Sequence, residues 1–393
     1  LIIEINNLNN IQMNFNLSES NLEIQKLARD FAQNRIAPDV MKYDEFSEFP
    51  WEIAKELGEM GFLGIMFPEE YEGSNLTILD YAIIVEEISK ADPSMGLTVA
   101  SHNGLCTNHI YTFSNDDLKK KYVPDLASGR KLGAWGLTES VSGSDAASMA
   151  TTAVKDGNYY ILNGSKSFIT QGGVGQTAVV TAVTDKSKGS RGISAFIVEK
   201  GFEGFSVGKK ENKLGMRSSD TCELIFDNCK VPVENLIGKE GEGFKQCMQI
   251  LDGGRISIAA LSVGIAQAAL DHSVKYAKQR KQFGKSLAEF QGIQFKIADM
   301  ATEVEAARLL TYKAAVMRDE GKDFKFAASL AKYFASEIAT KATNEAIQIH
   351  GGYGFIKEFP VEKLYRDVKL TTIGEGTSEV QKMIMARALV EMY

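Results

Sequence analysis

The sequence predicts an α+β fold with an N-terminal α-helical domain, a middle antiparallel β domain and a C-terminal four-helix bundle. Two observations indicate this arrangement. Apolar residues recur at helical spacing in the first and last thirds of the chain, whereas the middle third contains short runs of β-branched and aromatic residues between turn signals. The length of 393 residues fits two or three domains of roughly 150 residues each.

The composition excludes several classes of protein. A formal net charge of -7 argues against a nucleic-acid binder, which usually gathers a basic surface. The four cysteines and four histidines show no CxxC pair and no metal-ligand spacing, so we expect a reducing compartment and no metal. We find no apolar run near the roughly 20 residues of a membrane span and no basic start of a signal peptide, and so expect an intracellular protein without membrane insertion.

The N-terminal helical domain is predicted to cover residues 13–131. Residues 1–12 precede it and are interpreted as a possible start-site or cloning extension. Ser20 and Glu23 have the spacing of a capping box ahead of an apolar helix face. Further helix-period stretches are expected at 51–61 and 78–90.

The middle β domain is predicted to cover residues 132–240. Four runs rich in β-branched and aromatic residues are expected to form strands, at 159–162, 178–183, 193–198 and 222–226. Asp156-Gly157-Asn158 and Asn163-Gly164 are typical of turns.

The C-terminal domain is predicted to cover residues 241–393. Apolar stripes at alternating three- and four-residue spacing run through 245–279, 293–307, 324–347 and 378–391. Four such stripes are enough for an antiparallel four-helix bundle.

Common catalytic and nucleotide-binding motifs are absent from the sequence. It has no GxGxxG between a strand and a helix, no P-loop, no GxSxG elbow and no HExxH. Polar and glycine-rich clusters instead lie at predicted element boundaries, at 135–148, 167–173, 280–285, 348–355 and 371–381.

Each cluster has both a ligand-binding and a purely structural interpretation. The first is rich in hydroxyls and glycines that suit an anionic ligand, but it resembles an ordinary surface loop as well. The cations of 280–285 suit a helix C-terminus, with Gly284 as the stop signal, or a phosphate. Glu375 lies between two glycines ahead of a predicted helix, where a carboxylate can approach a ligand or be solvated. On the residues alone both interpretations stand open.

Taken together and in order, the clusters resemble the acyl-CoA dehydrogenase family from roughly residue 20 to the C-terminus. The GSD loop at 143–145, the Gly254-Arg255 pair, the QxxGGxG turn at 348–354 and the EGTSEVQ segment at 375–381 are similar to those of short-chain, butyryl-CoA-type members. The resemblance implies FAD-dependent α,β-dehydrogenation of a short-chain acyl-CoA to trans-2-enoyl-CoA, with electrons passed to electron-transfer flavoprotein.

The resemblance also implies a role for individual residues. Glu375 matches the catalytic base; some relatives carry the base just before the bundle arginine, and that position here is Gly254. The residues that match FAD contacts are Trp135, Leu137, Thr138, Ser144, Phe168, Ile169, Thr170, Arg280, Phe283, Gln291, Gln348, Gly351, Gly352, Thr377, Ser378 and Glu379. The residues that match substrate contacts are Ser144, Asp252, Arg255 and Gly376. Phe168 replaces the tryptophan usual at its position and keeps an aromatic face for the flavin.

Family members place the contacts at 280–291 and 348–352 against the FAD of a neighbouring subunit, which implies a homotetramer built as a dimer of dimers. They hydrogen-bond the thioester oxygen to a flavin ribityl hydroxyl and to the backbone N–H of the base. We expect burial to raise the pKa of Glu375 against the opposing effect of the nearby helix start. The expected location is the cytoplasm in a bacterium or the mitochondrial matrix in a eukaryote.

Other functions remain open at this point. Gly374 replaces a tyrosine common before the base, which favours a branched-chain acyl-CoA dehydrogenase as the alternative to butyryl-CoA. An acyl-CoA oxidase is a further alternative, although oxidases are generally longer. A non-catalytic helical scaffold or CoA-binding module is the alternative from another class of protein.

Overall fold

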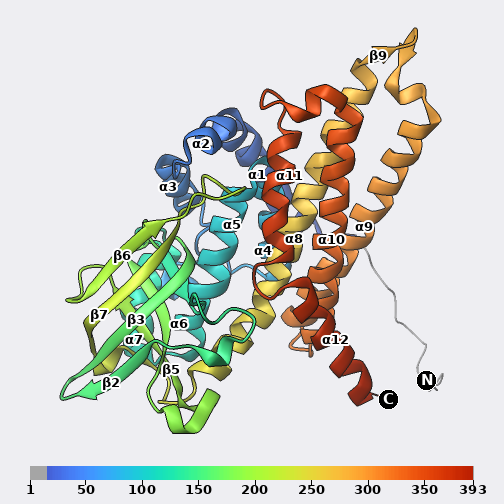
Figure 1. The fold of residues 1–393 in the computed structure, drawn as a ribbon. Coiled ribbons are helices and arrows are strands. Elements are labelled where there is room, and N and C mark those ends of the chain that lie inside the picture. The colour runs from blue at the N-terminus through green and yellow to red at the C-terminus, as the bar shows by residue number, and fades with distance from the viewer. Residues whose placement is uncertain (1–15, 393) are drawn as a thin grey trace.

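The computed structural model describes residues 16–392, so the predicted extension at 1–12 lies outside the described residues. Within these residues, helices form the first and last thirds and a twisted sheet forms the middle (Figure 1). The predicted helix, sheet, helix order is therefore confirmed.

The N-terminal helices form a layer against the C-terminal helices. They are α1 (Glu19–Phe31), α2 (Val40–Phe46), α3 (Trp51–Glu59), α4 (Ile78–Ala91), α5 (Pro93–Ser101), α6 (Asn108–Phe113) and α7 (Asp116–Ala127), with π-helical segments at Ala32–Ile36 and His102–Thr107. The helices expected at 51–61 and 78–90 are confirmed as α3 and α4. The predicted capping box was wrong by two residues, because Ser18 caps α1 and exchanges hydrogen bonds with Asn21.

The sheet contains β1 (Gly133–Gly136), β2 (Thr152–Asp156), β3 (Tyr159–Thr170), β4 (Thr177–Val183), β5 (Ile193–Glu199), β6 (Phe205–Lys210), β7 (Thr221–Pro232) and β8 (Leu236–Ile237). Its order is β6-β7-β3-β2-β4-β5-β8, with β1 also on β4. The four predicted strands correspond to β3, β4, β5 and β7. The expectation of a purely antiparallel sheet was wrong, because β1 and β2 both pair parallel to β4. The long connection from β1 to β4 permits this direction, and strand propensity does not encode it.

One of the two predicted turns is correct. Gly157 and Asn158 connect β2 to β3 in a tight hairpin. Asn163-Gly164 instead lies inside β3, where the pairing with β7 shifts register. The φ of 139° at Gly164 fits a bulge, which favours the same residues as a turn.

The C-terminal helices are α8 (Gly243–Gln279), α9 (Gln291–Asp319), α10 (Lys325–His350), α11 (Val361–Val368) and α12 (Ser378–Met392). The three longest lie side by side, and α11 and α12 pack on α10 (Figure 1). Each predicted apolar stripe is helical. Gly284 does not stop α8, which ends at Gln279 with Arg280 as its cap. Gly284 has a φ of 81° in the turn of the hairpin formed by β9 (Lys281–Gln282) and β10 (Lys285–Ser286).

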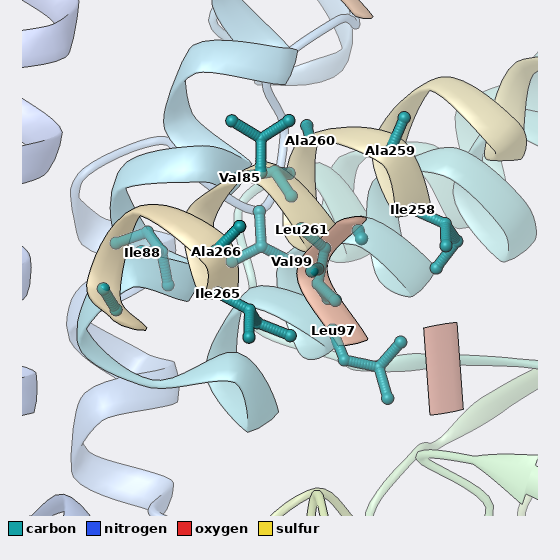
Figure 2. Packing of buried hydrophobic residues seen from close by; sticks show 14 of the residues in the cluster. Val85, Ile88, Leu97, Val99, Ile258, Ala259, Ala260, Leu261, Ile265 and Ala266 are labelled. Atoms are coloured by element: carbon teal, nitrogen blue, oxygen red, sulfur yellow. The ribbon is translucent and has the colours of Figure 1, made fainter. Parts of the chain in front are cut away.

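The main core lies where α4 and α5 pack on the middle of α8. Val85 and Ile88 of α4 and Val99 of α5 meet residues of α8 such as Leu261 and Ile265 (Figure 2). Within residues 16–392, α8 is long and apolar enough by composition to cross a membrane, yet 89% of its apolar window is buried inside the protein. We expected no apolar run near the length of a membrane span, and α8 is an exception to that expectation. Its apolar surface is part of the hydrophobic core.

Candidate active site

Glu375 lies in a tight turn immediately before α12. Its φ is 52° and that of Gly376 is 92°, so two consecutive residues are left-handed. A non-glycine residue in this conformation costs roughly 1–2 kcal/mol. The turn places the Glu375 carboxylate over Gly254 of α8, where a Cβ atom would lie 1.9 Å from Oε2. Gly254 therefore makes room for the carboxylate.

The Glu375 carboxylate is shielded from water. The residue as a whole is half-buried, but Oε2 is fully buried and has no hydrogen-bond partner within residues 16–392. Burial raises the pKa of Glu375 to about 7, and the positive charges of Lys332 and Arg255 oppose this rise. The expected rise in the pKa of Glu375 is thus present, and the causes that oppose it are these two side chains, which the expectation did not name. A carboxylate of this pKa can accept a proton near neutral pH.

The two cations beside Glu375 are held differently. Arg255 donates from Nη1 to Asp252 Oδ1 at 2.6 Å, and its Nε is buried without a partner among the described residues. Lys332 of α10 donates from Nζ to the Gly376 carbonyl at 2.8 Å. Burial lowers the pKa of Lys332 to about 8, against the raising effect of Glu375. Lys332 was not among the residues predicted from the sequence, where its only signal is a charged residue within an apolar helical stripe.

The π-helical segment His102–Thr107 lies close to Gly254 of α8 and to Tyr81 of α4. Leu105 lies in the π-helical segment after α5, and its Cδ2 would be 3.4 Å from a Cβ at Gly254. A Cβ at Gly104 would lie 2.7 Å from the Tyr81 hydroxyl, which donates to the Ala100 carbonyl at 2.6 Å. π-helical turns are often found at functional sites. Leu105 of this segment therefore places an apolar side chain close to the Glu375 carboxylate.

The structure brings together the two sequence clusters of the β domain. Ser167 N donates to Thr138 O at 2.8 Å, which joins the loop after β1 to the end of β3. Phe168 lies at a register shift of β3 with a φ of 60°, and 65% of its surface is exposed. An aromatic ring held outward in this way is suited to stacking against a flat ligand.

The other residues of this cluster divide by exposure. Thr138 and Thr170 are half-buried and Ser144 is exposed in its loop. The side chains of Leu137 and Ile169 are 7% and 2% exposed and belong to the core.

A buried ion pair anchors the loop that follows β1. Lys166 of β3 donates to Glu139 Oε1 at 2.7 Å and to the Leu137 carbonyl at 3.2 Å. Glu139 also accepts hydrogen bonds from the backbone of Ala150 and Thr151. Burial alone would raise the pKa of Glu139, but Lys166 and these donors hold it below its usual value. Sequence reasoning missed this pair, because the two residues are 27 positions apart.

Trp135 is fixed by a second buried chain. Its indole Nε1 donates to His109 Nδ1 at 3.0 Å, so the proton of the imidazole is on Nε2, which lies 3.1 Å from Gln246 Oε1 and donates to it. Burial lowers the pKa of His109 to about 4. The imidazole is thus neutral, and the Trp135 ring has one orientation.

The cofactor residues predicted at 280–291 and 348–352 lie at the far end of the helical bundle. A cavity of about 490 Å³ is lined by Arg280, Gly351, Gly352 and Tyr353 among others, with the Arg280 guanidinium 5.4 Å from the centre of the Tyr353 ring. Phe283 is 93% exposed at the hairpin tip. Gln291 begins α9 and Gln348 lies near the end of α10, outside the cavity lining. In Figure 1 this end, marked by β9, is opposite the sheet.

Residues after Glu375 begin α12. Thr377 Oγ1 accepts the Val380 N–H at 3.3 Å, and the Ser378 hydroxyl donates to Glu337 at 2.6 Å. Glu379 is exposed. The Ser378 hydroxyl is therefore engaged within the protein.

Three family models match the chain. They describe the N-terminal domain of acyl-CoA dehydrogenase over residues 18–130, its middle domain over 134–229 and its C-terminal domain over 241–390. The short-chain specific acyl-CoA dehydrogenase of Clostridium acetobutylicum is 47% identical over 374 residues, 95% of this chain and 99% of the relative. Subunit CarC of the caffeyl-CoA reductase-Etf complex of Acetobacterium woodii is 45% identical, over 95% of this chain and 99% of the relative.

Solved structures show the same similarity. Butyryl-CoA dehydrogenase from Megasphaera elsdenii superposes with a TM-score of 0.95 at 48% identity, covering 96% of this chain and 100% of that one. A chain from the structural work on the electron transferring flavoprotein of Acidaminococcus fermentans has a TM-score of 0.95 at 50% identity, covering 96% of this chain and 99% of that one.

Proposed function

The chain belongs to the acyl-CoA dehydrogenase family, and on that premise we propose that it is an FAD-dependent short-chain enzyme that converts butyryl-CoA to trans-2-enoyl-CoA. The observation that carries this proposal is the Glu375 carboxylate, buried over Gly254 with an unpartnered Oε2. A buried carboxylate with no hydrogen-bond partner and a raised pKa is typical of a functional acid or base.

Glu375 is proposed to remove the proton from the α-carbon of the thioester. A pKa of about 7 keeps much of the carboxylate ionised at neutral pH while making it a stronger base than an exposed glutamate. No hydrogen bond within residues 16–392 uses the Glu375 backbone N–H, which leaves this donor for the thioester oxygen as charge develops there. One donor of this kind is worth about 2.7–4 kcal/mol in other enzymes.

The residues of the Phe168 cluster and of the Arg280 cavity fit FAD. When bound, FAD supplies the acceptor for the hydride that leaves the β-carbon. Phe168 presents an exposed aromatic face for the flavin ring. The glycines and Arg280 of the 490 Å³ cavity suit a pyrophosphate, since glycine allows close backbone approach and arginine binds phosphate oxygens.

The positions of these two groups support an oligomer. Strand β3, which carries Phe168, and β9, which follows Arg280, lie on opposite sides of the molecule (Figure 1). One FAD would therefore contact the Phe168 cluster of one subunit and the Arg280 cavity of its neighbour. We therefore propose a homotetramer formed as a dimer of dimers. Electron-transfer flavoprotein is the proposed acceptor, supported by the Etf complex of the relative from Acetobacterium woodii. The four buried, unpaired cysteines suit a cytoplasmic or mitochondrial-matrix location.

Two alternatives have specific support. The similarity to a caffeyl-CoA reductase subunit favours the reverse direction, in which protonated Glu375 would deliver a proton to the α-carbon of an enoyl-CoA. A branched substrate is favoured by Gly374, where a Cβ would meet Leu370 atoms only at 3.5 Å or beyond. The space that a larger residue would fill is thus open.

The test is anaerobic mixing of the yellow holoenzyme with straight C4–C12 and branched acyl-CoAs, followed by electron-transfer flavoprotein or oxygen. We expect rapid flavin bleaching by butyryl-CoA and reoxidation by electron-transfer flavoprotein, with slow oxygen consumption. Glu375→Gln should keep its FAD and lose bleaching. A colourless protein, or a Glu375→Gln variant that is still reduced at the wild-type rate, would overturn the proposal. If enoyl-CoA oxidises the reduced flavin faster than acyl-CoA reduces the oxidised flavin, the reverse direction is indicated.

A further inference from the structure

We propose that Lys332 and Gln381 are positioning residues that clasp the Glu375-Gly376 turn, and that the charge of Lys332 tunes the base strength of Glu375. The inference rests on the proposed role of Glu375 as the base. Its structural part, the clasp, is independent of that role.

The clasp consists of hydrogen bonds from two helices to the turn. Lys332 Nζ of α10 donates to the Gly376 carbonyl at 2.8 Å. Gln381 Nε2 of α12 donates to the same carbonyl at 3.1 Å and to the Glu375 carbonyl at 3.3 Å. Both side chains are completely buried. The carbonyls of Glu375 and Gly376 are therefore both hydrogen-bonded to buried side chains. The Glu375 carboxylate points instead toward Gly254.

The turn needs such support because its conformation is unfavourable. Glu375 has a φ of 52° and Gly376 a φ of 92°, and left-handed non-glycine residues persist only where surrounding contacts impose them. A Cβ at Gly376 would lie 2.7 Å from Gln381 Nε2, so the clasp is tightly packed. Without it the turn would relax and move the carboxylate.

The hydrogen bond from Lys332 goes to a neutral carbonyl, so a neutral donor could also form it. The positive charge of Lys332 therefore has an effect separate from this bond. Within the described part of the chain it forms no ion pair closer than 4.0 Å, although it is fully buried. The charged groups that act on it are Glu375, Arg255, Glu337 and Glu379. Glu337 is engaged by the Ser378 hydroxyl. Among these charged groups, the carboxylate of Glu375 has the largest effect on the Lys332 cation.

The electrostatic consequence has a definite sign. Burial raises the pKa of Glu375, while Lys332 from α10 and Arg255 from α8 lower it; Tyr81 of α4 also faces the carboxylate. Removal of the Lys332 charge should raise the pKa of Glu375 by about 1 unit or more, the usual effect of a close opposite charge. Gln381 is neutral, so its removal should loosen the turn without this shift.

The experiment compares Lys332→Met, Gln381→Met and Lys341→Met as holoenzymes. Lys341 is the matched control, because it also lies on α10 but is exposed and pairs with half-buried Glu303 of α9 rather than with the turn. Two quantities are measured: the pH dependence of flavin reduction by butyryl-CoA, and hydrogen–deuterium exchange of the peptide covering 370–381 without substrate. We expect faster hydrogen–deuterium exchange in Lys332→Met and in Gln381→Met. Only in Lys332→Met should the rising limb of the pH profile of flavin reduction move upward, by about 1 pH unit. Lys341→Met should match the wild type.

The outcomes separate the parts of the proposal. Unchanged exchange in both clasp variants would overturn the clasp. If Lys332→Met reduces its flavin more slowly by the same factor at every pH, and the rising limb of the pH profile does not move, the proposed effect of the Lys332 charge on Glu375 is overturned. If Lys332→Met fails to fold, unchanged exchange in Gln381→Met still overturns the clasp, and the limb is then tested with Lys332→Gln. If no acyl-CoA reduces the wild type, the proposed function fails while the exchange experiment still decides the clasp.

Discussion

Gly254→Ala tests whether the carboxylate of Glu375 works where the structure places it. The new Cβ would lie 1.9 Å from Glu375 Oε2 and 2.9 Å from Cδ. It would lie 3.4 Å from Leu105 Cδ2, which is an ordinary contact. The carboxylate is therefore the group that has to move. Because alanine is a better helix former than glycine by about 1 kcal/mol, the substitution should not unfold α8.

The expected effect follows from the size of that displacement. Oε2 has to retreat from 1.9 Å to about 3.4 Å, a movement of about 1.5 Å. A misplacement of about 1 Å in a catalytic group can cost roughly 100-fold in rate. We expect the rate constant for flavin reduction by acyl-CoA to fall at least 100-fold, with FAD content and thermal midpoint close to those of the wild type.

The assay is stopped-flow flavin reduction under anaerobic conditions. The Glu375→Asp variant gives a matched background, since its shorter side chain withdraws the carboxylate from Gly254. In that background Gly254→Ala should cost less than about tenfold, because the contact with the new Cβ is relieved. Wild-type rates in Gly254→Ala would refute the reasoning, as would an equal cost in both backgrounds.

Three further predictions concern Glu375, the ion pair and Phe168. The pKa of Glu375 rises from 4.5 to about 7 in the folded protein, so the wild type should lose stability as pH rises from about 4.5 through 7; Glu375→Gln should have the higher thermal midpoint at pH 8, with the difference vanishing near pH 4.5. Lys166→Met leaves the buried Glu139 without its partner and should destabilise the protein by about 3–5 kcal/mol in chemical denaturation, whereas Lys166→Met combined with Glu139→Gln should recover part of this loss. Phe168→Ala removes an outward-facing ring, so circular dichroism and thermal midpoint of the FAD-free protein should be unchanged while FAD affinity falls about tenfold; retained wild-type FAD affinity would contradict stacking on Phe168.

Local patterns were enough to predict most elements of this fold. Helical periodicity depends on neighbouring positions only, and the stripes predicted for α8, α9, α10 and α12 are helices. β propensity likewise located β3, β4, β5 and β7. The failures arose where local signals are ambiguous: Asn163-Gly164 suits a bulge as well as a turn, and Gly284 suits a hairpin as well as a helix end.

The candidate site divides in the same way. The flanking glycines of Glu375 and the cluster around Phe168 are contiguous in sequence and were identified from it. Lys332 was not, because it is 44 positions from the carbonyl that it holds. The Lys166–Glu139 pair is similarly formed by residues from separate elements.

Sequence alone determined the family, the order of helices and strands, and the residue type at the expected base, because all of these depend on residues that are neighbours in the chain. Only the tertiary structure decided the parallel pairing of β1 and β2 with β4 and the contact of Glu375 with Gly254. It also decided which cations oppose the effect of burial on the pKa of Glu375. These depend on distances between remote segments. The proton affinity of a buried carboxylate is set by such distances, so it is a property of the folded chain.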